Sequence, residues 1–289
     1  MFCPLSSPLT TNSIRNPAEI YESPPSPDPP EAPCARGRAQ GAFRAAKIGK
    51  AGAETAREGD PMSYLIVVAH PDDEVLGAGA TMHKLSQTGR EVGVCVLSGQ
   101  AEARAGRPAD SELAADMGSC LRLLGVSRTY AGGFPNIMLN TVPHLELVRF
   151  IEAAMEDSRA EVVITHHPAD LNNDHLHTSL ACQEAARLFQ RRPSRTPLRE
   201  LLYMEVPSAT EWSLNAGMAG FRPDTFVEVG AEGVERKLEA LARYRGVMRG
   251  YPHPRSREGI FGLAAYRGMQ SGCLYAEAFQ TALRRVTAV

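Results

Sequence analysis

The sequence contains no long hydrophobic run, no paired cysteine motif and no excess of charge of one sign. No apolar segment approaches the roughly 18 residues that a membrane-spanning helix needs. The N-terminus lacks the basic region, apolar stretch and cleavage site of a secretory signal. The 31 Lys and Arg residues nearly balance the 33 Asp and Glu residues, whereas nucleic-acid-binding proteins usually carry a clustered basic excess. We therefore expect neither a membrane span nor a nucleic-acid partner.

The six cysteines are scattered along the chain. Their spacing is not that of a disulfide framework, so it predicts a reducing, cytoplasmic environment. A hydrophobic content of 43% is ordinary for a globular protein and allows a full core. The 289 residues fit one large domain or two small ones.

Residues 1–61 differ in composition from the rest of the chain. They contain ten of the 21 prolines and few large apolar side chains. Such a segment cannot bury enough surface to offset the entropy of ordering it, so we expect a disordered extension. A plain linker, a proline-rich ligand for an aromatic groove and sequence translated upstream of a natural start at Met62 all remain open.

Residues 62–289 alternate between strand and helix patterns, which predicts a single α/β domain with a mostly parallel sheet. The expected strands are 64–69, 91–97, 129–131, 161–165, 201–206 and 225–229. The expected helices are 74–86, 111–124, 141–158, 175–189, 231–248 and 260–270. Thr141 is expected to cap the third helix, with Leu145, Val148 and Ile151 facing inward.

Polar side chains gather after two of these strands. One group is Ala69–Glu74 (AHPDDE) and the other is His166–His175 (HHPADLNNDH). The carboxyl ends of parallel strands form the ligand-binding edge of an α/β sheet, so both groups can face one crevice. Imidazoles and carboxylates without a nearby thiolate suit zinc best, with iron or manganese as competitors. Two residues from the first group and one histidine from the second would supply the three ligands of a catalytic site.

Each group also has a simpler interpretation. The acidic residues of the first group are favoured in the first turn of any helix, where they match the helix dipole. Asp174 is equally suited to cap a helix, with His175 exposed after it. The occurrence of both groups at strand ends favours the metal site. Gly77-Ala78-Gly79 lies inside a predicted helix and lacks GxGxxG spacing, so it is weak evidence for nucleotide binding.

The two groups resemble the motifs of a known family. Residues 69–74 are similar to the AHPDDE motif of the LmbE-like (PIG-L) de-N-acetylases, and Asp170–His175 is similar to their second motif. The resemblance runs from about residue 63 to the C-terminus, through 252–256 (PHPRS) and 275–279 (YAEAF). It implies a Rossmann-like sheet with helices on both faces. It also implies a zinc cofactor and hydrolysis of the N-acetyl group of glucosamine-containing substrates.

Carried over residue by residue, the resemblance implies that His70, Asp73 and His175 bind zinc and that Asp72 is the general base. Asn172 stands where the family often has a histidine that serves as proton donor or oxyanion partner. An amide can donate a hydrogen bond to an oxyanion but cannot shuttle a proton. Asn172 is therefore expected to contact the substrate, and the identity of the acid stays open.

Four further residues are assigned to the site. Asp174 is expected to orient a metal-binding imidazole without itself contacting the metal. Arg104, in the loop after the second strand, and Arg255 are expected to contact the substrate, Arg255 through an anionic group. His253, between two prolines, is the hypothetical general acid, with His167 as second choice. The alternatives are a solvated charge for Arg104 and a rigid surface loop around His253.

The predicted activity is zinc-dependent hydrolysis of the N-acetyl group of an N-acetylglucosamine-type amino sugar or its conjugate, releasing acetate. The expected partner is this small amino sugar, and a homo-oligomer is compatible with the sequence. Three alternatives remain. They are a zinc amidase for a larger sugar or thiol-sugar amide, a non-catalytic sugar-binding protein on the same fold, and a nucleotide-cofactor enzyme on a Rossmann sheet.

Overall fold

The computed structural model describes residues 62–99, 109–187, 192, 197–214 and 219–286. The expected extension 1–61 and the loop that contains Arg104 lie outside these residues. Within the described part of the chain, every helix is too short or too polar to cross a bilayer.

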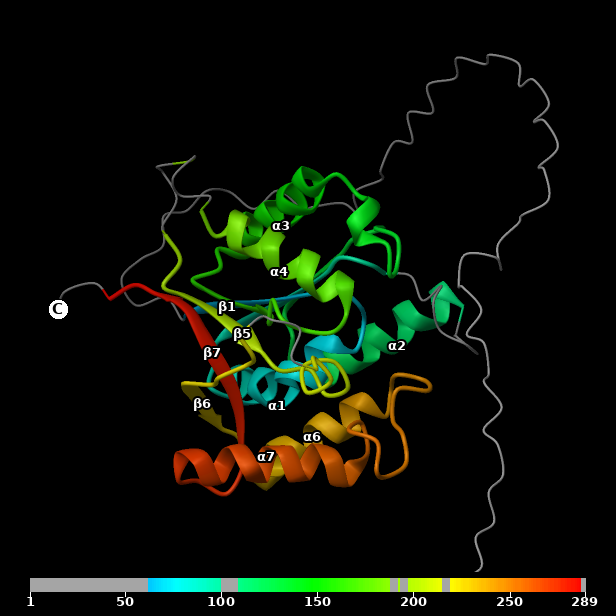
Figure 1. Cartoon of the computed structure of the whole chain (residues 1–289), viewed down its shortest axis with the longest axis vertical. Helices are drawn as coiled ribbons and strands as arrows, with labels where there is room; N and C mark the ends of the chain where they lie inside the picture. The colour runs from blue at the N-terminus through cyan, green and yellow to red at the C-terminus, as the bar shows by residue number, and fades with distance from the viewer. Residues whose placement is uncertain (1–61, 100–108, 188–191, 193–196, 215–218, 287–289) are drawn as a thin grey trace, which may run out of the picture. The chain divides into compact units, whose positions relative to one another are not determined.

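The described residues form a seven-stranded sheet in the order β3-β2-β1-β4-β5-β7-β6 (Figure 1). Five neighbouring strands are parallel: β1 (Ser63–Val68), β2 (Glu91–Val96), β3 (Arg128–Ala131), β4 (Val162–His166) and β5 (Glu200–Met204). At one edge, β7 (Ala276–Arg284) runs antiparallel between β5 and β6 (Thr225–Glu228).

Helices cover both faces of the sheet (Figure 1). One face carries α3 (His144–Ser158) and α4 (Asn173–Ala185). The other face carries α1 (Asp73–Gln87), α2 (Asp110–Leu123), α6 (Gly230–Leu241) and α7 (Arg257–Ser271). A short 3-10 helix, η2 (Leu139–Thr141), precedes α3. The expected α/β fold, with a mostly parallel sheet between two helical layers, is confirmed.

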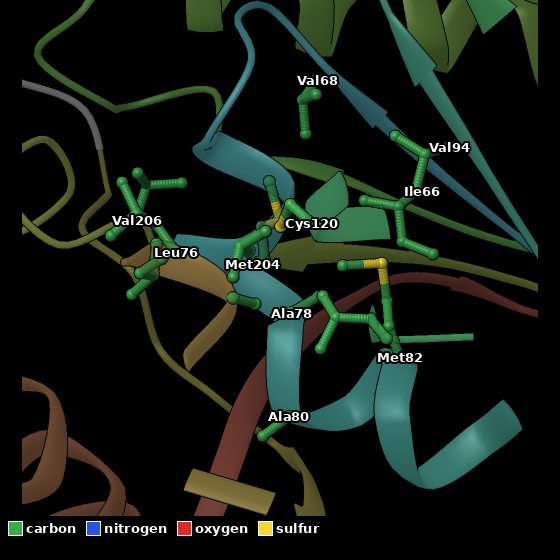
Figure 2. Close-up of a cluster of buried hydrophobic side chains, with 14 of the residues drawn as sticks. Ile66, Val68, Leu76, Ala78, Ala80, Met82, Val94, Cys120, Met204 and Val206 are labelled. Carbon is green, nitrogen blue, oxygen red and sulfur yellow. The ribbon is translucent and has the colours of Figure 1, made fainter. Parts of the chain in front are cut away.

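The central strand β1 contributes to a hydrophobic cluster on each face. Leu65 and Val67 pack toward α3 and α4, whereas Ile66 and Val68 pack toward α1 and α2. Figure 2 shows Ile66 and Val68 among side chains from α1, α2, β2 and the β5 region. All four β1 side chains are fully buried, and each stabilises the fold by about 1.5–3 kcal/mol. Burial on both faces explains why this strand is continuously apolar.

The centre of the sheet is also the place where the strand order reverses. β1 and β4 are neighbours, with Val67 paired to Thr165. The chain proceeds from β1 through β2 and β3 on one side and from β4 to β5 on the other. Open α/β sheets bind ligands outside the carboxyl ends of the strands at such a point. Both polar groups of the sequence follow these two strands.

Three details of the expected elements are wrong. α3 begins at His144 rather than after Thr141, because Pro143 disfavours helical angles in the residue before it. Leu145, expected inward, is consequently exposed, and Leu147 is buried instead. The helix expected to continue to Met248 ends at Leu241, and no strand was expected at the position of β7.

Candidate metal centre

A sharp turn joins β1 to α1 and positions Asp72. Its φ of 104° is in the left-handed region, which non-glycine residues rarely adopt and which costs about 1–3 kcal/mol. The Asp72 carbonyl accepts the amides of Val75 and Leu76, so its backbone starts the helix. Its side chain makes no capping hydrogen bond and lines a cavity instead. Helix capping therefore does not account for this carboxylate.

Three buried side chains converge beside this turn. Oδ2 of Asp73 lies 3.3 Å from Nδ1 of His70 and 3.2 Å from Nε2 of His175. The same oxygen accepts the backbone amide of His70 at 3.0 Å, which orients the carboxylate. A tetrahedral zinc ion with ligands at about 2.0–2.1 Å places its ligand atoms about 3.3–3.4 Å apart. The measured separations and the donor types fit such an ion.

The carboxylate of Asp174 fixes the protonation of His70. Its Oδ2 lies 2.9 Å from Nε2 of His70 and accepts the amide of Ile137 at 2.6 Å, while Oδ1 accepts the amide of Leu139 at 3.0 Å. A carboxylate in this setting accepts hydrogen bonds, so Nε2 of His70 is the protonated nitrogen. Nδ1 then faces Asp73 and, once it has lost its own proton, can present a lone pair to a metal.

Asp170 has the same relation to His175. Its Oδ2 lies 3.0 Å from Nδ1 of His175, which leaves Nε2 facing Asp73. Burial lowers the pKa of His175, but Asp73 and Asp170 outweigh this effect and raise it to about 10. The pKa of His70 is also raised, because hydrogen bonds to Asp174 and Asp73 outweigh its burial. The centre therefore stabilises positive charge, as expected of a cation site.

His166, Asp170 and His175 form a second group with metal-like spacing. Nε2 of His166 accepts the amide of Ala69 at 2.9 Å, so the ring carries its proton on Nδ1. Burial lowers the pKa of His166 well below its usual value, which keeps the ring neutral. Neither nitrogen is then available to a metal. The ring instead stacks on His175, with centroids 3.8 Å apart.

A cavity of about 430 Å³ lies beside the converging donors. Its wall includes all three donors, Asp72, Asn172, Trp212, Arg249 and Arg255. Nε of Arg255 donates to Oγ of Ser208 at 2.6 Å, and its Nη1 lies 3.4 Å from Oδ2 of Asp72. Arg255 thus lies in the cavity wall, and its contact with a substrate stays a prediction.

Asn172 has a structural role as well as a place in the cavity wall. Its Oδ1 accepts the amide of Asp174 at 2.9 Å and caps α4. Asp174 is therefore not the helix cap, and His175 is buried rather than exposed. Because the carbonyl oxygen of the Asn172 side chain is used for capping, its NH₂ group is the part that can donate to a ligand.

The structure does not bring the two candidate acids to the donors. His253 is absent from the residues that line the cavity. Its Nδ1 accepts the amide of Arg255 at 3.0 Å, and its ring packs edge-on against Trp212. His167 also lies outside the cavity wall and packs edge-on against Tyr203. Both histidines support neighbouring side chains.

Several residues of the site were not predicted from the sequence. Asp170 was part of the second group but had no assigned role, because no regular spacing links it to His175. Ser208, Trp212 and Arg249 come from segments after β5 and α6 that only the tertiary fold brings to this edge. One signal was available, since Trp212 is the single tryptophan of the chain.

Comparison with known proteins agrees with these motifs. Residues 65–186 match the family model PIG-L, described as GlcNAc-PI de-N-acetylase. The uncharacterized deacetylase YaiS of Escherichia coli is 29% identical over 190 residues, covering 63% of this chain and 89% of that protein. The chain also resembles a solved N,N'-diacetylchitobiose deacetylase from Pyrococcus horikoshii, with a TM-score of 0.61 and 20% identity over 77% of this chain and 84% of that one. The 4-carboxy-2-hydroxymuconate hydratase GalB of Pseudomonas putida gives a TM-score of 0.62 and 21% identity over 79% and 99% of the two chains.

Residues 65–186 match the PIG-L (LmbE-like) family model, and the proteins similar to this chain include deacetylases. The matched segment runs from β1 to the end of α4 and contains both polar groups. The family resemblance seen in the sequence is confirmed, and with it the assignment to a family of hydrolytic enzymes. A hydratase shares the fold, so the reaction has to be argued from the site.

Proposed function

We propose that this protein is a metal-dependent N-deacetylase that hydrolyses the N-acetyl group of an amino sugar or its conjugate. The observation that carries the proposal is the position of Asp72, which is buried beside three converging donors and lines the same cavity. Two imidazoles and one carboxylate favour zinc, with iron or manganese as alternatives. The PIG-L family match supports the same reaction class.

The residues of the cavity divide the reaction between them. His70, Asp73 and His175 would hold a divalent cation, which would supply Lewis acidity toward an amide carbonyl and toward water. Asp72 takes a proton from water as the water oxygen bonds to the carbonyl carbon. The C–N bond then breaks, the amine nitrogen takes a proton, and the acyl group leaves as acetate.

Asp72 also supplies the proton for the leaving amine. Among the described residues of the cavity wall, the groups other than Asp72 are ligands, arginines or side chains that do not titrate near neutral pH. The proton that Asp72 takes from water is therefore the one it returns to nitrogen. This assignment accounts for an asparagine at position 172, because no second acid is required.

Substrate contacts come from the rest of the wall. The NH₂ group of Asn172 donates toward the oxygen that develops negative charge. The half-exposed indole of Trp212 offers a flat apolar face to a sugar ring. An anionic part of a conjugate meets Arg255. We place the protein in the cytoplasm, because Cys95, Cys120 and Cys182 are buried free thiols, as expected in a reducing compartment.

An acetate-release assay tests the proposal. Purified protein is analysed for bound metal and then assayed on N-acetylglucosamine, N,N'-diacetylchitobiose and charged N-acetylglucosamine conjugates, with and without a chelator. Acetate release that the chelator abolishes supports the proposal. Sugar binding without acetate release favours the non-catalytic alternative, and release only from larger N-acyl groups favours the amidase. Protein that binds no divalent metal and releases no acid contradicts the proposal.

A further inference from the structure

Helix α1 is interrupted near its start. Ala78 has φ −143° and ψ 19°, which are not helical angles, although the segments on both sides are helical. Figure 2 labels Leu76, Ala78 and Ala80 along this part of α1. In a continuous helix the Leu76 carbonyl would accept the amide of Ala80, four residues later. Both residues lie in the core, where backbone polar groups need a partner.

A buried ion pair from two other elements provides partners for these groups. Nζ of Lys237, on α6, donates to the Leu76 carbonyl at 2.7 Å. Glu277, on β7, accepts the amides of Ala80 and Thr81 at 3.2 and 2.7 Å. Lys237 and Glu277 are 2.7 Å apart and about 5% exposed. The ammonium and the carboxylate therefore stand where a helical hydrogen bond would join Leu76 to Ala80.

Two glycines make room for this arrangement. A Cβ atom at Gly79 would lie 3.1 Å from Cγ of Lys237, and one at Gly77 would lie 2.3 Å from Sδ of Met204. The Gly77-Ala78-Gly79 stretch is thus explained by close packing around the bend in α1. It is not a phosphate-binding turn.

Stability alone does not explain a buried ion pair at this place. The cost of desolvating two charges can exceed their attraction, and apolar replacements of similar volume are often neutral or stabilising. What the pair fixes is the direction of the first turn of α1, because side chains inserted into the hydrogen-bond ladder bend a helix. This turn begins with Asp73 and follows Asp72 directly.

We propose that Lys237 and Glu277 are positioning residues that keep α1 bent, so that Asp72 and Asp73 face the donors of the β4–α4 segment. The roles of the two aspartates in this inference rest on the proposed function. Without the pair, α1 can close the hydrogen bond between Leu76 and Ala80 and become straight. Straightening would move Asp73 away from its two histidine partners.

The test replaces both charges in the double variant Lys237→Met/Glu277→Leu. We expect this variant to fold with little change in melting temperature, since it fills the same space without buried charge. We expect its zinc affinity, measured by competition with a chelator, to be weaker by about 10–100-fold, as for other residues that orient metal ligands. A zinc affinity equal to that of the wild type would overturn the inference.

A second ion pair provides the matched control. Arg267 on α7 and Glu205 after β5 are also largely buried, with contacts at 2.7 and 2.5 Å. We expect Arg267→Met/Glu205→Leu to keep the wild-type zinc affinity, because the hydrogen bonds described for this pair do not involve α1. If the Lys237/Glu277 double variant fails to fold, Glu277→Gln is compared with Glu205→Gln. Equal zinc affinities in those two single variants would overturn the inference.

A crystal structure of the metal-free double variant separates this inference from the proposed function. Helical angles at Ala78 together with a displaced Asp73 support the positioning role. A bend and an Asp73 position unchanged from the wild type overturn it. Either result holds whether or not the wild type binds zinc or releases acetate.

Discussion

Asp170 holds the ring of His175 through Nδ1, with the carboxylate oxygen 3.0 Å from the nitrogen. Asp174 holds His70 through the other ring nitrogen, Nε2, at 2.9 Å. One histidine consequently presents Nε2 to Asp73, and the other presents Nδ1. A carboxylate behind each imidazole fixes its tautomer and increases its basicity toward a metal.

The first prediction follows from the hydrogen bond between Asp170 and His175. We expect Asp170→Asn to weaken zinc binding by about 10–100-fold, because the neutral amide polarises His175 less and can turn its NH₂ group toward the ring. Asp157→Asn is the control, since Asp157 accepts from the Tyr130 hydroxyl away from the site. Chelator competition measures both affinities. Equal values for the two variants would show that Asp170 does not support the ligand.

The second prediction concerns the ligands themselves. We expect His175→Ala to lose bound metal, because a catalytic zinc site needs three protein ligands. His177→Ala is the control, since His177 lies on the same helix but does not line the cavity. Elemental analysis of the purified variants measures the metal content. Wild-type metal content in His175→Ala would refute the ligand assignment.

The third prediction distinguishes the role of Asp72 as general base from the role of the metal ligands. We expect Asp72→Asn to keep its metal and to lose about 10²–10⁴-fold in kcat, since it removes proton transfer only. Asparagine tolerates left-handed backbone angles, so the turn at φ 104° should persist. The measurements are metal content and steady-state acetate release. Activity close to that of the wild type would exclude Asp72 as the base.

The fourth prediction is that zinc affinity increases with pH. In the metal-free protein burial lowers the pKa of His175, but Asp73 and Asp170 raise it to about 10. Zinc must displace this proton, so we expect affinity to rise about tenfold per pH unit between about pH 6.5 and 8. A pH-independent zinc affinity would contradict the charge assignment.

The titration of His175 also makes the stability of the metal-free protein depend on pH. The folded pKa of His175 lies above its unfolded value of about 6.5, so its contribution is fully present below about pH 6.5 and is lost as the pH rises through about 10. We therefore expect the melting temperature of metal-free protein to fall more steeply over that range than that of zinc-loaded protein.

Local sequence patterns were sufficient to predict most of the fold. The apolar runs at β1 and β4 predict strands buried on both faces, and the fold has them at its centre. β7 was missed because the polar Glu277 and the small residues Ala276 and Ala278 leave no apolar run, although Ala276–Phe279 are all buried. Glu277 lies inside this buried run, and only the partners on α1 and α6 explain a charge there.

Some residues of the candidate site could likewise be predicted from the sequence, and others could not. His70 and Asp73 are three residues apart in one motif, and His175 ends the other, so the sequence alone could name these donors. Asp170 could not be assigned, because its contact to His175 depends on an irregular loop. The contact between Arg255 and Asp72 joins positions far apart in the sequence, and only the folded chain brings them together.

The last prediction concerns His253, the hypothetical general acid named from the sequence. The ring packs edge-on against Trp212 and accepts the amide of Arg255, and both of these neighbours line the cavity. We expect His253→Ala to raise KM about 2–10-fold through loss of the aromatic pair, with the pH profile of kcat unchanged. His253→Phe keeps the ring contact but cannot titrate, so we expect its KM to lie close to that of the wild type. If both variants flatten one limb of the pH profile, His253 does transfer a proton, and Asp72 is not the acid.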